Sequence, residues 1–115
     1  MRKTIPLLAL MLMFVGCSFS QREVSVKDIT KSETIILKKK QGQGSISSIR
    51  IAGSGSISGK ADVLLILNGS VYKRKELNGS VRFEWSGDWY ADEAEVRYVS
   101  GTVSSGTLTL KYDLR

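Results

Sequence analysis

This sequence has no histidine, and it has only one cysteine and one proline among 115 residues. Without imidazole, nucleophile systems of the Ser-His-Asp and Cys-His types are excluded, and so are metal sites built on histidine. A hydrolase that uses two carboxylates remains as an alternative, although so short a chain offers little room for the necessary cleft. A single thiol also cannot form an internal disulfide. We therefore expect a protein that is not an enzyme, with no catalytic residues, no metal and no cofactor.

Long apolar runs are absent except at the N-terminus. There, Met1-Arg2-Lys3 precedes an apolar stretch from Ile5 to Val15, and Gly16-Cys17 follows it. Positive residues, an apolar middle and a small residue before the cut are the parts of an export signal. As a helix the apolar stretch would span roughly 18 Å, short of the roughly 30 Å hydrocarbon core of a bilayer. The segment therefore predicts a removable signal peptide and not a transmembrane helix.

The end of this signal, Phe14-Val15-Gly16-Cys17, resembles the lipobox of bacterial lipoproteins, although Leu is more usual at its first position. The resemblance implies cleavage before Cys17 and lipidation of its thiol, with acyl chains such as palmitate holding the protein on a membrane. It also implies a location in the cell envelope, and Ser18 favours the outer membrane in Gram-negative bacteria of the enteric type. An ordinary secretory signal cut after Ser20 is the alternative, and it would release a soluble domain that begins at Gln21.

These features divide the chain into a signal peptide (1–16), a lipidated N-terminus and tether (17–32), and one domain (33–115). The tether is mostly polar, which suits a spacer between the lipid and the domain. The alternation of Val24 and Val26, with Ile29 nearby, leaves open a short edge strand in this segment. Arg2 and Lys3 belong to the signal, so the formal charge of +6 overstates the charge of the domain.

From Thr34 onward the apolar residues recur with a period of two, between breaks of Gly, Ser and Asn, and nothing predicts a long helix. The stretch 61–67 is almost continuously apolar, which is typical of a central strand covered on both sides. Three other segments alternate clearly and should each turn one apolar face to a common core. Their apolar residues are Val81, Phe83 and Trp85; Val96 and Tyr98; and Leu108, Leu110, Tyr112 and Leu114.

Glycine marks the expected turns. Residues 54–59 predict a bend or bulge between two short strands. Asn68-Gly69 and Asn78-Gly79 both predict two-residue hairpins, because both residue types tolerate the positive φ of a type I′ turn. Strands at about 61–67, 70–77 and 80–86 should then form a meander. Seven to eight strands in so short a domain predict an all-β fold, a small antiparallel β-sandwich or a compact barrel.

Two basic runs, 38–40 and 73–75, have few aromatic neighbours, so we expect no nucleic-acid partner. Lysine on an edge strand commonly prevents pairing between sheets of different molecules, and this is our first interpretation. Attraction to the phosphates of anionic lipid or lipopolysaccharide is the alternative. On the second run, Lys73 and Lys75 should share a strand face with Val71 and Leu77.

The stretch from Trp85 to Glu95 is the best candidate for a ligand site, because it combines aromatic residues with carboxylates around a glycine. In one interpretation Trp89 and Tyr90 stack on a sugar ring, with Asp88 and Asp92 nearby. The spacing matches no EF-hand, so a metal is not expected. In the other interpretation Trp85 and Tyr90 close one end of the sandwich, and the acidic residues form a solvated turn.

The sequence thus predicts a small cell-envelope lipoprotein whose β-sandwich is a binding or structural module for an envelope protein. Glycan or small-ligand binding through the 85–95 loop is the alternative function.

Overall fold

The computed structural model describes residues 21–115, so the signal peptide and the predicted lipidation site, Cys17, lie outside the described residues. All regular elements of the described part are strands. They are β1 (Arg22–Ser25), β2 (Glu33–Lys38), β3 (Ser48–Leu67), β4 (Ser70–Asp88), β5 (Glu93–Ser100) and β6 (Ser105–Leu114). No helix among these residues is long and apolar enough to cross a membrane.

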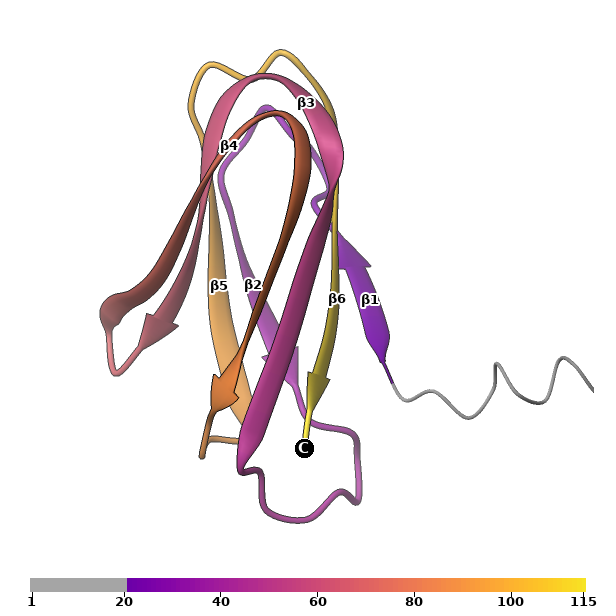
Figure 1. The fold of residues 1–115 in the computed structure, drawn as a ribbon, viewed down its shortest axis with the longest axis vertical. Coiled ribbons are helices and arrows are strands. Elements are labelled where there is room, and N and C mark those ends of the chain that lie inside the picture. The colour runs from indigo at the N-terminus through magenta and orange to yellow at the C-terminus, as the bar shows by residue number, and fades with distance from the viewer. Residues whose placement is uncertain (1–20) are drawn as a thin grey trace, which may run out of the picture.

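The strands form one antiparallel sheet that curls over on itself into two facing layers (Figure 1). The first half of β3 pairs with β6, its second half pairs with β5, and β4 follows β3 along its other side. The first layer therefore has the order β1-β6-β3-β4, and the second has the order β2-β5-β3-β4. The predicted all-β antiparallel fold is confirmed, and the expected strand count fits because β3 and β4 each contribute a segment to both layers.

Glycine allows β3 and β4 to pass together from one layer to the other. The register jumps between the pairs Ile57↔Gly79 and Lys60↔Asn78, which leaves two residues of β3 without a partner on β4 at the bend. Gly59 has a φ of +113° and Gly79 a φ of +73°, values that L side chains disfavour. The bend predicted within 54–59 is therefore present, in the form of a bulge at its end.

The two Asn-Gly pairs have different roles. Asn68 and Gly69 have φ values of 52° and 81° and join β3 to β4 in the predicted hairpin. Asn78-Gly79 is not a hairpin turn, because β4 continues through it and remains paired with β3 on both sides. The predicted meander is therefore wrong after residue 77. The segment at 80–86 pairs with the first half of β3 and not with 70–77.

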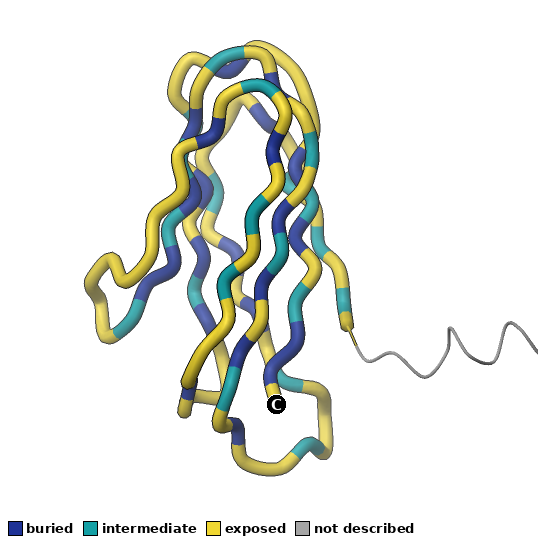
Figure 2. Tube along the Cα trace, viewed as in Figure 1, coloured by how far each residue is buried: buried dark blue, intermediate teal, exposed yellow. Residues whose placement is uncertain are grey.

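Side chains from both layers fill the space between them. Burial alternates along most of the strands, as predicted, but Ser70–Glu76 of β4 is exposed throughout (Figure 2). Val63 and Leu65 of the second layer and Ile51 of the first are at most 1% exposed. Phe83 and Trp85 pack against this core and are themselves partly buried. Gly53 pairs with Phe83, and a Cβ added to Gly53 would lie 2.2 Å from the Phe83 ring. The phenylalanine ring therefore covers the glycine and takes the place of its missing side chain.

The N-terminal segment is only in part a tether. Strand β1 pairs with β6, with Arg22 opposite Tyr112, and Ile29 is buried in the core. The tether predicted for 17–32 must therefore be shortened, because its residues from Arg22 onward belong to the domain. The edge strand that the alternation of Val24 and Val26 left open is present.

A buried tyrosine fixes this segment to the second layer. The Tyr98 hydroxyl donates a hydrogen bond of 2.6 Å to the carbonyl of Ile29. Burial, with a smaller effect from the charge of Asp28, raises the pKa of Tyr98 above its ordinary value of 10.0. The folded state thus holds this proton more tightly than the unfolded state. The resulting stability is complete below pH 10 and is lost as the pH rises toward the folded-state pKa.

Tyr98→Phe is expected to lower the free energy of unfolding by about 1 to 2 kcal/mol at neutral pH, because a buried hydrogen bond is lost. It should also reduce the fall in stability above pH 10, since the titrating group is gone. Urea unfolding at several pH values between about 7 and 11 would measure both effects. Tyr90→Phe, at an exposed position, is the control. An alkaline fall in stability of the same size in Tyr98→Phe would contradict this assignment.

Candidate functional site

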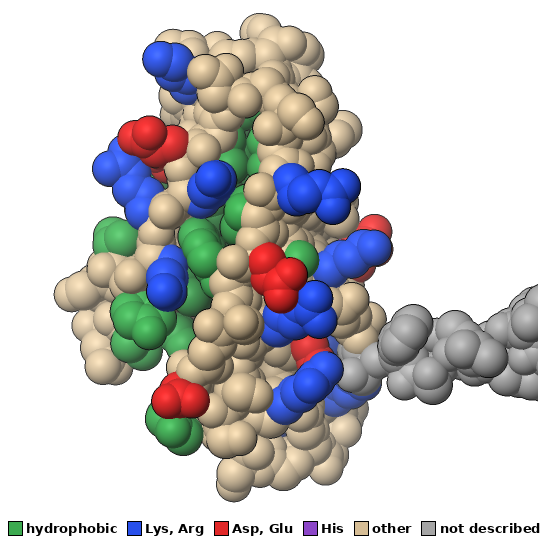
Figure 3. Space-filling model, in the orientation of Figure 1, with side chains coloured by type: hydrophobic (Ala, Val, Ile, Leu, Met, Phe, Trp, Pro, Cys, Tyr) green, Lys and Arg blue, Asp and Glu red, His purple; other side chains and the backbone are tan. Residues whose placement is uncertain are grey.

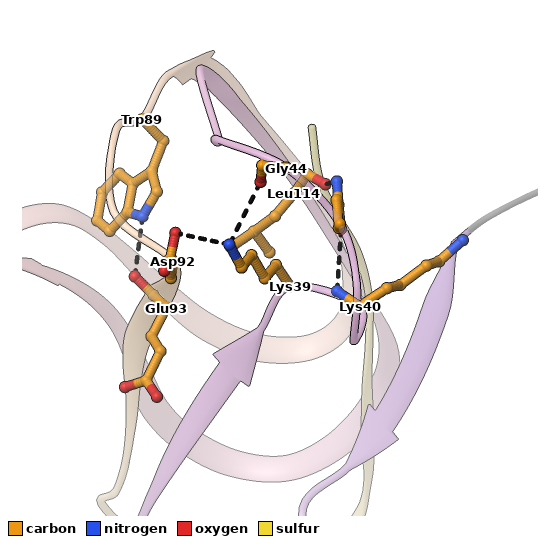
Figure 4. Close-up of polar contacts among 8 residues, drawn as sticks. Lys39, Lys40, Gly44, Trp89, Asp92, Glu93 and Leu114 are labelled. Carbon is orange, nitrogen blue, oxygen red and sulfur yellow. Dashed lines mark hydrogen bonds and ion pairs between the residues drawn. The ribbon is translucent and has the colours of Figure 1, made fainter.

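The predicted ligand loop closes one end of the sandwich (Figure 4). Residues 89–92 cross from β4 in the first layer to β5 in the second. Trp89 is 4% exposed, and its indole Nε1 donates a hydrogen bond of 2.9 Å to the carbonyl of Glu93. Its backbone N–H donates to the carbonyl of Ser47 at 3.1 Å. The indole of Trp89 thus caps the core, and its backbone N–H links the two loops at this end.

The facing loop, which joins β2 to β3, is held to the same end by polar contacts. The Lys39 ammonium lies 3.3 Å from a carboxylate oxygen of Asp92 and donates to the carbonyl of Gly44, also at 3.3 Å. The Gln43 side chain accepts a hydrogen bond from the Lys40 N–H and donates to the carbonyl of Leu114. These contacts hold the two loops together and close this end of the sandwich (Figure 4).

The four residues predicted for ligand binding are not brought together as a site. Tyr90 is 76% exposed, whereas the neighbouring Trp89 is buried, so the two rings offer no joint stacking surface. Asp92 is paired with Lys39, and Asp88 is exposed at the end of β4. Within residues 21–115 no group of three potential metal-ligating side chains is present. An aromatic residue does close this end, but it is Trp89 and not Tyr90, while Trp85 lies within β4 opposite Ile51, with its ring centre 5.0 Å from that of Phe83.

A depression of about 310 Å³ lies beside the bend, near Lys60 and Asn78. Three of its four charged lining residues are paired with one another, since Arg74 lies 3.2 Å from Asp62 and 3.5 Å from Glu76, whereas Lys60 has no ion pair among the described residues. The hydrogen bond from Arg74 to Asp62 raises the pKa of this guanidinium. The depression therefore presents one exposed ammonium, that of Lys60, beside a neutralised cluster, which is not a ligand site by itself.

The remaining candidate is the side of β4 that faces away from β3, which we call the β4 edge. Strand β4 spans Ser70–Asp88, and within the described residues it pairs with β3 alone. Its edge therefore carries unpaired backbone N–H and C=O groups over the length of two layers. In Figure 3, hydrophobic side chains are visible in the region of β4, with Lys and Arg side chains around them.

A bulge changes the faces of β4 from those expected. Between Leu65 and Ile66 the register shifts, so that Val71 pairs with Ile66 and Lys73 pairs with Leu65. Because Leu65 and Ile66 point to opposite faces of β3, Val71 lies on the outer face and Lys73 on the inner one. The prediction that Val71 shares a face with Lys73 and Lys75 is therefore wrong.

No protein family and no curated protein matches this chain. The residues of the chain itself must therefore indicate its function. Sequence reasoning placed the second basic run on an edge strand, and the run does lie on one. It did not identify the β4 edge as a possible site, because strand order is not encoded in the alternation of a single strand.

Proposed function

We propose that this protein is a cell-envelope lipoprotein whose non-catalytic β-sandwich binds a protein partner by accepting a strand at the β4 edge. The membrane part of the proposal is supported by the resemblance of residues 14–17 to a lipobox, with Cys17 as the lipidated residue. The binding part rests on one observation, the unpaired side of β4. Outer-membrane attachment is part of the same proposal for a Gram-negative host.

The length of β4 supports its edge as the binding element. An incoming extended segment gains affinity from backbone hydrogen bonds and specificity from pockets for alternate side chains. The other outermost strands, β1 and β2, have 4 and 6 residues, whereas β4 has 19. Ile29, in the connection between β1 and β2, is buried in the core. The side chain of Arg22 in β1 donates a hydrogen bond to the carbonyl of Lys38 in β2. These contacts bring β1 and β2 together at their side of the sandwich.

Intact mass would test the anchor. Protein recovered from membranes is expected to begin at Cys17 and to carry acyl mass, and a Cys17→Ser variant is expected to lack that mass. A soluble chain that begins at Gln21 would overturn the membrane part of the proposal and support secretion instead.

Site-specific photo-crosslinking would test the binding part. A photoreactive residue in place of Val71, which is exposed in the first half of β4, should give an adduct of one defined mass in intact cells. The same residue in place of Lys111, which is exposed on β6, is the matched control and should not. Co-expression of an excess of the unmodified protein should suppress the Val71 adduct. Adducts of equal yield at both positions, or none at either, would count against a role for the β4 edge.

A further inference from the structure

Two lysines at the β4 edge lie on the inner face of the sheet. Lys73 pairs with Leu65 and Lys75 pairs with Val63, and both partners are buried in the core. Directly paired residues of antiparallel strands share a face, so the two lysine stems run along the side of the core. Both lysines are nevertheless exposed, because no further strand of the described chain covers this side of β4.

These two charges differ from Arg74, which lies between them, in having no carboxylate partner among residues 21–115. On the outer face of the same segment, Arg74 is paired with Asp62 and Glu76. The Lys73 ammonium contacts only an aromatic ring, 5.3 Å from the ring centre of Tyr72, and Lys75 has no ion pair. The unpaired positive charge of the segment is therefore on the face that an added strand would cover.

The lysines disfavour most strands that could add here. A strand placed beside β4 would take the inner-facing ammonium groups out of water, and burial of a charge without a partner is strongly unfavourable. A second copy would not solve this problem. In an antiparallel pair of β4 strands centred on Gly79, Lys73 would lie beside Trp85 and Lys75 beside Phe83, neither of which carries a negative charge. The lysines thus protect the edge against self-association, as inner-facing charges do in other sheets.

The same two charges would favour one kind of strand. Building on the strand-binding function proposed above, we propose that Ser70–Leu77 accepts an acidic extended segment of a partner protein, with carboxylates at positions i and i+2. In a strand, alternate side chains lie on one face about 7 Å apart, so two such carboxylates would face Lys73 and Lys75 together. An apolar residue two positions beyond the carboxylate that faces Lys75 would lie beside Leu77, which is buried. Rejection of neutral strands and acceptance of acidic ones then have the same cause.

A protein segment fits this arrangement better than a membrane surface does. Lipid headgroups form a broad plane and attract cations that project outward from the protein. Lys73 and Lys75 instead flank an unpaired strand edge and the opening between the two layers, where Tyr72, Lys73 and Trp85 line a narrow cavity of about 20 Å³. An extended chain can reach this position and pair with the backbone at the same time.

Labelled peptides and the full-length protein in detergent would test the proposal. The first peptide has two glutamates at alternate positions among threonines, with a leucine two positions beyond them. The second has the same composition with the glutamates adjacent, so that they point to opposite faces. The third has glutamines in place of glutamates. Fluorescence anisotropy is expected to give at least about tenfold tighter binding of the first peptide than of the other two, with a loss of affinity at high salt.

Charge reversal provides the matched variant. In Lys73→Glu/Lys75→Glu the preference should disappear, and a peptide with lysines at the alternate positions should bind instead. Lys38→Glu/Lys111→Glu, at two exposed lysines on other strands, should bind as the unmodified protein does. Because all four side chains are exposed, neither double variant is expected to unfold. Circular dichroism would verify that both variants are folded.

Three results would overturn the inference. Equal binding of all three peptides, or no binding of the first, would show that the lysines do not select an acidic strand. Equal binding of the two isomeric peptides, together with Lys73- and Lys75-dependent binding to phosphatidylglycerol vesicles, would identify a surface for anionic lipid. A dimer that Lys73→Glu/Lys75→Glu abolishes would identify a second copy as the partner. In each case, the crosslinking yields at Val71 and Lys111 decide separately whether the strand-binding function stands.

Discussion

Trp89→Ala is expected to lower the free energy of unfolding by about 3 to 5 kcal/mol, the range for removal of a buried large aromatic side chain. Trp89 is 4% exposed and caps the core where two crossing loops meet. Its removal would leave a cavity and would also take away the hydrogen bond to the carbonyl of Glu93. For a domain of this size, whose total stability is about 5 to 15 kcal/mol, such a loss is a large fraction.

Urea unfolding followed by the fluorescence of the remaining Trp85 would measure this effect. Tyr90→Ala is the matched control, because Tyr90 is adjacent in sequence and 76% exposed. Its effect should stay within about 0.5 kcal/mol, as for most exposed positions. In the unmodified protein, sugars should leave the Trp89 emission unchanged. Equal and small losses in both variants, or a sugar-dependent emission of Trp89, would restore the ligand-loop interpretation.

Gly106→Ala is expected to cost about 2 to 4 kcal/mol, because the glycine combines a disfavoured backbone conformation with a close approach of two strands. Gly106 has a φ of +129°, and it pairs with Ile57 just before the bend of β3. A Cβ at this position would lie 2.2 Å from the carbonyl oxygen of Ser56 and 2.6 Å from the Cα of Ile57. Because both contacts are to backbone atoms, β6 would have to move away from β3.

Thermal unfolding would compare this variant with Gly44→Ala. Gly44 has no positive φ, and nothing lies within 4 Å of a Cβ built there, so its substitution should be nearly neutral. A neutral effect of Gly106→Ala would mean that β6 and β3 lie further apart at the bend than these distances indicate.

Local patterns predicted the parts of the fold that depend on neighbouring residues. The period of two identified the inner faces of the strands, since burial on one side of a sheet imposes alternation. Asn68-Gly69 was correctly predicted as a hairpin because its turn conformation is a local property. Asn78-Gly79 has the same local chemistry, but β3 bends beside it and the two strands cross the layers together. The choice between a hairpin and a bend therefore depends on a partner strand about 20 residues away in sequence.

The candidate site was less predictable for a similar reason. The sequence showed aromatic and acidic residues in one loop, but the β2–β3 connection decides which aromatic residue is buried. That connection contributes Ser47 as an acceptor for Trp89 and Lys39 as the partner of Asp92. The face of Val71 was predicted wrongly because one bulge reverses the alternation. The exposure of the β4 edge follows from the order of strands, a property of the whole sheet.

The pairing of β1 with β6 has a consequence for how this domain folds. Arg22 lies opposite Tyr112, and Glu33 of β2 lies opposite Tyr98, so both outer strands depend on partners far along the chain. Of the strand pairs, only β3 and β4 are joined by a tight turn. Sheets dominated by such distant pairs fold slowly, on the order of milliseconds to seconds, because long loops must close before the contacts form. The β3–β4 hairpin should therefore form early, and the sheet cannot be completed until β6, the last strand, joins it.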